Sequence, residues 1–204
     1  MPGFWRDGEP LVLASGSATR RDMLASAGLP VEVVRPELDE RTVEAAFLAS
    51  GGAASGIAAA LAEAKALAVS PLRPGRWILA ADQTLSCGGE AFHKPRDAAE
   101  ARAQIAALAG RDHVLTSAYA LARDGMIRAN GARDARLTMR PLGPEEIARY
   151  VALAGETATG SVGGYRIEEL GAHLFAAVEG DHFTILGLPL FDLLASLRAC
   201  GLLA

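Results

Sequence analysis

The 204-residue sequence has few residues that could form a disulfide framework or a zinc site. Its only two cysteines, Cys87 and Cys200, lie far apart and lack metal-ligand spacing, which favours reduced structural thiols over a disulfide or a nucleophile. The four histidines do not share metal-ligand spacing such as His-x-x-x-His, which argues against zinc. The chain is long enough to bury a substantial core without either device.

Long hydrophobic runs are also scarce. Although 50% of the residues are hydrophobic, many are alanines in helical stretches such as 58–67, and none approaches the roughly 18 apolar residues of a membrane span. Near the N-terminus, where Asp7 and Glu9 lie, no basic segment precedes an apolar core, so no secretory signal is predicted. We therefore expect a soluble, cytoplasmic protein.

Excess positive charge is absent as well. A net charge of -4 and a pI near 5.6 argue against broad binding of nucleic acid or an anionic membrane, because such binding needs an extended basic face. No Gly-x-x-x-x-Gly-Lys-Ser/Thr run is present, which excludes the P-loop nucleotide hydrolases. An anionic ligand must therefore be bound locally, where cations gather around glycine and serine.

The sequence alternates apolar strands with helical stretches, which predicts an α/β fold. Strands are expected at residues 11–14, 31–34, 77–81, 114–122, 126–138 and 173–178, and helices from about residue 18 and at 41–49, 57–70, 98–108, 144–154 and 189–200. Asp124-Gly125 predicts a hairpin between the fourth and fifth strands. Because no repeat or flexible linker is present, we expect one domain over residues 1–204, with a two-lobed form left open.

The turn after the first strand has the composition of a phosphate site. It reads Ser15-Gly16-Ser17-Ala18-Thr19-Arg20-Arg21. Backbone N–H groups at a helix start, two hydroxyls and two guanidinium groups would give a phosphate several charge-assisted hydrogen bonds. An ordinary serine cap with solvated arginines explains the same residues equally well.

Two carboxylates are candidates for a metal or water site. Asp82, followed by Gln83, comes where the strand at 77–81 is expected to end, and Glu40 follows the second strand. Ligands of open α/β sheets gather beyond the carboxyl ends of strands, where a carboxylate can hold Mg²⁺ or position a water. A turn or helix cap is the alternative for Asp82, and a first-turn acid is the alternative for Glu40.

Lys65 and Lys94 stand out because nearly all cations in the chain are arginines. An ammonium suits a phosphate without demanding the planar fork of a guanidinium. A solvated surface lysine is the alternative for each.

Together these residues resemble the Maf family. Its pattern Ser-x-Ser-x-x-Arg-x-x-x-Leu is matched by Ser15, Ser17, Arg20 and Leu24. The resemblance covers nearly the whole chain, through the ordered segments Asp39-Glu40, Lys65, Ala81-Asp82-Gln83, Lys94-Pro95, Gly110-Arg111-x-His113 with Thr116, Glu146-Ile147-x-x-Tyr150, Gly164-Tyr165, Glu179-Gly180 and Leu186-Gly187-Leu188-Pro189-Leu190.

The resemblance implies an elongated mixed β-sheet flanked by helices, with two lobes around a central cleft. It implies a nucleoside triphosphate pyrophosphatase that uses a divalent metal, Mg²⁺ or Mn²⁺, and cuts between the α- and β-phosphates. The substrate would be the main partner, with no nucleic acid and no membrane, and a homodimer is left open.

Within this resemblance each candidate residue has an expected role. Asp82 would bind the metal or orient the attacking water, and Glu40 would be the second metal or water contact. Arg20, Lys65 and Lys94 would offset the roughly four negative charges of a triphosphate. The expected substrate-binding set is Ser15, Ser17, Arg20, Arg21, Gln83 and Glu168.

The chain departs from a common family form at three places. It has Asp82-Gln83 for Asp-Thr, His93 for a glycine before Lys-Pro, and Tyr165-Arg166-Ile167-Glu168-Glu169 for Tyr-Gly-Ile-Gln-Gly. The first and last resemble the branch associated with 7-methylguanosine triphosphate more than the one associated with thymidine and uridine triphosphates, although the loop matches neither cleanly.

Glu168 bears on the preferred base. A carboxylate only accepts hydrogen bonds, so it complements the N1–H and N2–H₂ donors of guanine. The alternative is a solvated loop residue that pairs with Arg166.

Two rival functions remain. A nucleotide-binding regulator of septum formation would not need the joint retention of Arg20, Lys65, Asp82 and Lys94. An inosine-triphosphate-type pyrophosphatase shares the reaction but lacks the Ser-x-Ser-x-x-Arg opening.

Overall fold

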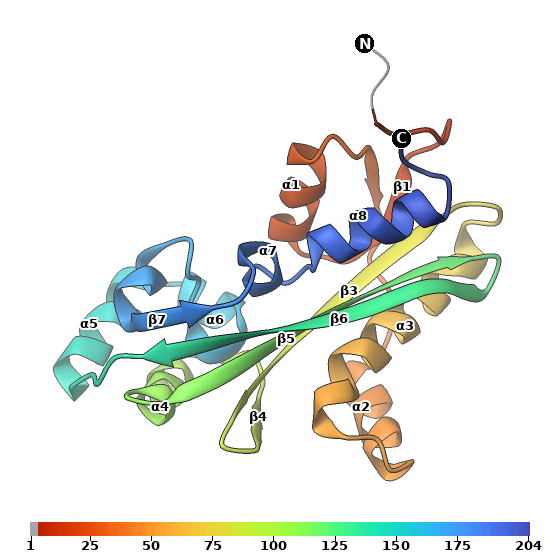
Figure 1. Ribbon diagram of the computed structural model, residues 1–204. Coiled ribbons are helices and arrows are strands. Elements are labelled where there is room, and N and C mark those ends of the chain that lie inside the picture. Colours follow the sequence, from red (N-terminus) through yellow and green to blue (C-terminus); the bar gives the residue numbers. More distant parts are fainter. Residues whose placement is uncertain (1–3) are drawn as a thin grey trace. The chain divides into compact units, whose positions relative to one another are not determined.

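The computed structural model describes residues 4–204 as a seven-stranded mixed sheet with flanking helices (Figure 1). The strand order is β2-β1-β3-β5-β6-β7, and β4 pairs with β3. This confirms the predicted α/β class. The chain divides into two compact units, of which unit 1 runs up to Gln83 and adds Thr116–Arg133 and His182–Ala204, and unit 2 comprises Thr84–Leu115 and Asp134–Asp181.

Unit 1 contains the parallel part of the sheet. Strand β1 lies between β2 and β3 and is parallel to both. The elements that lie wholly or partly in this unit are β1 (Leu11–Ala14), α1 (Ala18–Ser26), β2 (Val31–Val33), α2 (Glu40–Ala49), η1 (Ala54–Gly56), α3 (Ile57–Val69), η2 (Ser70–Leu72), β3 (Ile78–Cys87), β5 (Asp112–Arg123), β6 (Met126–Met139), α7 (His182–Ile185) and α8 (Leu190–Ala199).

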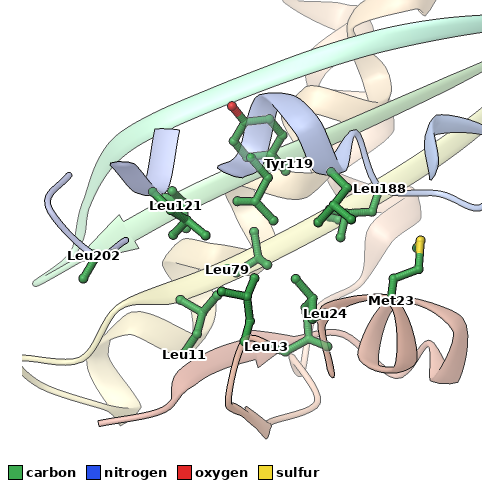
Figure 2. Packing of buried hydrophobic residues seen from close by; sticks show 14 of the residues in the cluster. Leu11, Leu13, Met23, Leu24, Leu79, Tyr119, Leu121, Leu188 and Leu202 are labelled. Atoms are coloured by element: carbon green, nitrogen blue, oxygen red, sulfur yellow. The ribbon is translucent and has the colours of Figure 1, made fainter. Parts of the chain in front are cut away.

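Alternation along the strands of unit 1 separates two cores. Large side chains, among them Leu11, Leu13 and Leu79, point to the face covered by α1 and α8 (Figures 1 and 2). The residues between them, such as Val12 and Ala80, point to the opposite face, which α3 covers. Most side chains in this second core are alanines, so α3 can pack close to the sheet. Polar side chains on the buried face of α3 therefore also lie close to the sheet.

One segment contradicts the expectation that no stretch approaches the length of a membrane span. Residues Ala54–Leu72 form a continuous helical run of 19 residues with a mean hydropathy of 1.2, which is sufficient by length and composition. Its alanines count as apolar although each buries little area. Because α3 packs against the sheet through Ala58, Ala62 and Ala66, this segment is accounted for as a core helix.

Unit 2 contains a hairpin extension of β3 and a set of short helices. Its remaining elements are β4 (Glu90–Phe92), α4 (Ala98–Leu108), α5 (Pro144–Ala154), α6 (Thr157–Gly160), η3 (Val162–Gly164), η4 (Leu170–Leu174) and β7 (Phe175–Glu179).

The predicted hairpin at Asp124-Gly125 is confirmed between β5 and β6, with φ values of 53° and 74°. Both cysteines are free thiols.

Candidate functional site

Polar side chains gather in unit 1 where β1 ends. Strand β1 pairs with β3 as far as Ala14 opposite Ala80, so Asp82 lies two residues past the last paired position. The prediction that β3 itself ends before Asp82 is wrong. Strand β3 continues to Cys87 because its second half pairs with β4. This pairing is hard to predict from the sequence, because β4 has only three residues.

The serines after β1 shape the start of α1. Ser17 is the N-cap, and its Oγ accepts a hydrogen bond from the backbone N–H of Arg20 at 3.3 Å. The Oγ of Ser15 accepts from the backbone N–H of Ser17 at 3.2 Å. The serine cap expected for this turn is therefore confirmed, and it fixes the direction in which Arg20 leaves the helix.

Arg20 is directed toward β3. Its Nε donates to the carbonyl of Gly187 and its Nη1 to the carbonyl of Ala81, both at 2.8 Å, and Nη1 also lies 3.3 Å from the Oγ of Ser15. Burial lowers the pKa of Arg20, while the charges of Asp82 and Glu40 raise it. Arginine titrates so high that the group stays cationic at neutral pH.

Lys65 joins two carboxylates. Its Nζ lies 2.5 Å from Oδ1 of Asp82 and 2.9 Å from Oε1 of Glu40. The side chains of Lys65 and Asp82 are 8% and 11% exposed, whereas that of Glu40 is 54% exposed. Burial raises the pKa of Asp82, and the charges of Lys65 and Arg20 oppose this shift. Two cations thus balance two carboxylates.

Glu40 reaches this position from the first turn of α2. The carboxylate of Asp39 caps that helix by accepting from the backbone N–H groups of Arg41 and Thr42. Glu40 is therefore a first-turn acid, as its alternative interpretation expected, and it also pairs with Lys65. We call Ser15, Arg20, Glu40, Lys65 and Asp82 the Asp82 cluster.

Asp82 and Glu40 are the residues of the Asp82 cluster that could hold part of the coordination shell of a divalent metal. Among residues 4–204, no group of three or more His, Cys, Asp or Glu side chains could hold a metal. Mg²⁺ is commonly held by one or two carboxylates together with substrate phosphates and water. Asp82 and Glu40, which share one ammonium, provide such a pair of carboxylates.

Two predicted residues of unit 1 have other partners. Arg21 is exposed and pairs with the neighbouring Asp22 at 2.8 Å. The side-chain amide of Gln83 donates within unit 1, to Ser117 and to the backbone of α7. The sequence did not predict the backbone carbonyls of Ala81 and Gly187, which accept hydrogen bonds from Arg20. A backbone acceptor can belong to any residue type, so no sequence pattern marks it.

The remaining predicted residues belong to unit 2. Lys94 is exposed between β4 and α4, beside His93, whose carbonyl accepts a hydrogen bond from Gln104 at 3.0 Å. Glu168 is exposed in the turn after Tyr165. The alternative in which Glu168 pairs with Arg166 does not hold, since Arg166 pairs with Glu169 at 3.2 Å.

A buried aromatic cluster holds the segment that leads to Glu168. The hydroxyl of Tyr165 lies 2.6 Å from Nε2 of His113, and the ring of Phe175 packs against both rings. The hydroxyl of Tyr150 donates to the carbonyl of Gly164 at 3.3 Å. Burial lowers the pKa of His113 to about 4 and raises that of Tyr165. His113 is therefore neutral at physiological pH.

The buried His113 predicts a loss of stability in mild acid. A folded-state pKa of about 4, below the unfolded value of about 6.5, means that stability is full above pH 6.5 and falls as the pH drops toward 4. Between pH 7.5 and 5 this group alone should lower the unfolding free energy by about 2 kcal/mol. Urea unfolding of wild type and His113→Gln at both pH values measures the difference.

The matched control for this prediction is His173→Gln, at an exposed histidine of unit 2. The control should follow the wild-type pH dependence, whereas His113→Gln should show a shallower one, whatever its stability at pH 7.5. Parallel profiles for wild type and His113→Gln would contradict the assignment.

Comparison with known proteins adds the family. Residues 10–200 match the model of the family described as Maf-like protein. A nucleoside triphosphate pyrophosphatase from Rhodopseudomonas palustris (strain HaA2) is 52% identical over 202 residues, which is 98% of each chain. A 7-methyl-GTP pyrophosphatase from Mesorhizobium japonicum is 51% identical over 193 residues, which is 95% of this chain and 97% of that protein.

Among solved structures, the Staphylococcus aureus Ham1 protein overlaps 65% of this chain and 71% of its own, with a TM-score of 0.40 and 17% identity. An overlap of this quality carries no argument about function. The relatives are about half identical to this chain over almost their entire length, and the family model matches most of the chain. These two matches establish the family. This chain belongs to the Maf-like protein family.

Proposed function

We propose that this protein hydrolyses nucleoside triphosphates to the monophosphate and pyrophosphate. The observation that carries the proposal is the Asp82 cluster, in which Lys65 lies between Glu40 and Asp82 and Arg20 is held beside them. The relatives named nucleoside triphosphate pyrophosphatase and 7-methyl-GTP pyrophosphatase support the same reaction.

The cations of the cluster suit the bond that breaks. Cleavage between the α- and β-phosphates moves negative charge onto the departing pyrophosphate. Arg20 and Lys65 are already fixed by their partners, so they would stabilise this charge without reorganising during the reaction. Lys94, which is exposed in unit 2, remains a proposed phosphate-binding residue, because an ammonium suits a phosphate oxygen.

The carboxylates would handle the metal and the water. We propose that Asp82 and Glu40 hold Mg²⁺ or Mn²⁺, or that Asp82 orients the attacking water with Glu40 as its second contact. When bound, the metal would neutralise phosphate charge and polarise the bond to be cut. Asp82 is buried, which gives it a fixed position, whereas Glu40 is more than half exposed.

We also propose that the reaction takes place in the cytoplasm. Both cysteines are free thiols, and Cys200 is partly exposed. Free thiols persist in a reducing compartment.

Pyrophosphate release from a panel of nucleoside triphosphates, with Mg²⁺ or Mn²⁺ and with a chelator as control, tests this proposal. We expect pyrophosphate and the nucleoside monophosphate in equal amounts, and no release with the chelator. Triphosphate binding without turnover would favour the regulator. A strong preference for inosine or xanthosine triphosphate would favour the inosine-triphosphate-type enzyme, and release of orthophosphate would refute the cleavage position.

We further propose that the preferred base is guanine or 7-methylguanine rather than thymine or uracil. Glu168 supports this preference because its carboxylate is exposed, and Arg166, its nearest expected partner, pairs with Glu169 instead. A carboxylate complements the two adjacent donors on the edge of guanine, whereas an amide can also donate to a pyrimidine edge. The relative named 7-methyl-GTP pyrophosphatase supports the same base.

Replacing Glu168 by glutamine should erode this preference. If Glu168 reads the base, the preference for GTP or 7-methyl-GTP over dTTP or UTP, taken as RT ln of the ratio of their kcat/KM values, should fall by about 1–3 kcal/mol, the usual cost of an unpaired polar group. The matched control is Glu169→Gln, which makes the same change one residue away, at the partner of Arg166, and should leave the ratio unchanged. A wild type that favours dTTP or UTP, or a Glu168→Gln variant with an unchanged ratio, would remove Glu168 from the base pocket.

A further inference from the structure

Backbone carbonyls of unit 1 hold the guanidinium of Arg20 at two of its nitrogens. Nε donates to Gly187 and Nη1 to Ala81. The hydrogen bonds that hold this guanidinium therefore involve Nε and Nη1. Because two of its nitrogens are held, the guanidinium plane is fixed, and its charge is presented to a phosphate oxygen in a set direction.

Position 187 lets the backbone come this close to Arg20. A Cβ on Gly187 would lie 3.3 Å from Nη2 and 3.5 Å from Nε of Arg20. The φ of Gly187 is +99°, a conformation that side chains disfavour. Glycine thus permits both the turn of the backbone and the contact between its carbonyl and Arg20.

The turn at Gly187 is anchored through α7. This helix has only four residues, so its last carbonyls cannot all be satisfied within it. The Nε2 of Gln83 donates to the carbonyls of Ile185 at 2.9 Å and Thr184 at 3.2 Å, and the Oγ of Ser117 donates to that of Thr184 at 2.7 Å. Ile185 lies two residues before Gly187, so Gln83 fixes the segment that orients Arg20.

The neighbours of the Gln83 amide set its orientation. Nε2 faces two carbonyl oxygens and the hydroxyl of Ser117, and a carbonyl accepts a hydrogen bond only from the amide nitrogen. Both N–H groups are therefore committed within unit 1. Ser117, Thr184 and Ile185 are 0%, 1% and 7% exposed, so water cannot replace this amide easily.

We propose that Gln83 and Gly187 are positioning residues that fix the Arg20 guanidinium through α7. The inference rests on the proposed function, in which Arg20 binds the phosphates of the substrate. A cation held in place before the reaction loses no free energy to reorientation as charge develops. Gln83 thereby acts on the reaction through Arg20 and does not touch the substrate, in place of the substrate-binding role expected from the sequence.

A double-mutant cycle tests this coupling. Gln83→Met keeps the volume of the side chain but removes both donors, and should lower kcat/KM by about 10- to 100-fold through a misplaced Arg20. In an Arg20→Ala background the same substitution should have almost no further effect, because the group through which it acts is gone. Multiplicative losses, or a changed base preference, would mean that Gln83 touches the substrate itself.

A spectroscopic signature separates positioning from general stability. The Nε–H of Arg20, assigned by its loss in Arg20→Lys, should give a nuclear magnetic resonance signal that exchanges slowly with water in wild type and rapidly in Gln83→Met. Tyr119→Phe is the control, since it removes partly buried hydrogen bonds to Ser196 and to the carbonyl of Asp192. It should lower the melting temperature but leave both the signal and kcat unchanged.

Gly187→Ala provides a second variant should Gln83→Met fold poorly, and it should give the same loss of the Arg20 signal by direct contact. An Arg20 signal that persists in both variants would overturn the inference. A wild type that shows the protected signal but releases no pyrophosphate would contradict the proposed function while leaving the positioning intact.

Discussion

Replacing Asp82 by asparagine is expected to lower kcat by about 10²-fold or more, the loss typical of removing an acid–base group or metal ligand. The substitution keeps the volume of the side chain but removes its charge from a buried site, where Nζ of Lys65 lies 2.5 Å away. An amide binds divalent metal more weakly and cannot accept a proton from water. Triphosphate binding should remain measurable, since Arg20 and Lys65 are retained.

The fold should survive this change. Removal of one partner from a buried ion pair costs about 3–5 kcal/mol when the other charge is left alone, but Lys65 keeps Glu40 at 2.9 Å. Circular dichroism melting should therefore show a cooperative transition at reduced temperature. If this transition is lost, the variant is unfolded and its kcat says nothing about the role of Asp82. Asp82→Glu, which keeps the charge, would then be compared with the wild type instead.

The matched control is Asp124→Asn. Asp124 is an exposed acid in the β5–β6 hairpin at φ 53°, a turn position that asparagine favours. The same change of acid to amide should leave kcat within about twofold there, as for most surface substitutions away from a site. Retention of most of the wild-type kcat by Asp82→Asn would refute the assignment of Asp82.

Local signals in the sequence were sufficient for much of the fold. Helix α5 begins at Pro144, as predicted, because proline suits the first helical position. The bounds of α4 were also predicted correctly, and Asp97 caps it by accepting from the backbone N–H of Glu100. The β5–β6 hairpin followed from Asp124-Gly125, whose positive φ values this turn requires.

Strand β3 could not be bounded in the same way. Its apolar run ends at Ala81, and the polar Asp82 and Gln83 suggest that the strand has stopped. The strand continues because distant residues pair with it, and β4 is too short to be recognised. The local pattern therefore identified the position of Asp82 near a strand end but assigned that end to the wrong strand, since it is β1 that stops beside it.

The polar residues of the site likewise differ in whether local sequence signals or distant residues determine their positions. Arg20 and Glu40 were predictable because each lies in the first turn of a helix that follows a strand, and the structure brings them together with Lys65 and Asp82. The environment of Gln83 was not predictable, because two of its three acceptors are carbonyls about 100 residues later in the chain. No residue type marks such acceptors.

The two adjacent arginines should differ sharply in their effect on turnover. Successive residues of an α-helix point about 100° apart, so only one of the pair can face β3. Arg20 does so, with hydrogen bonds to the carbonyls of Ala81 and Gly187. Arg21 is exposed and pairs with Asp22. The same substitution at the two positions therefore separates a held cation from a solvated one.

Arg20→Ala is expected to lower kcat/KM by about 10²- to 10³-fold, the range for loss of one preorganised donor to a developing negative charge. Both kcat and KM should worsen, because a cation beside the phosphates acts in the ground state and more strongly in the transition state. Arg21→Ala should change kcat/KM by no more than about threefold, in line with the small value of exposed charges. Steady-state kinetics of both variants with one triphosphate measures the contrast. Equal losses would mean that both guanidinium groups reach the phosphates, and a change in base preference without a change in rate would place Arg20 at the nucleoside end of the substrate.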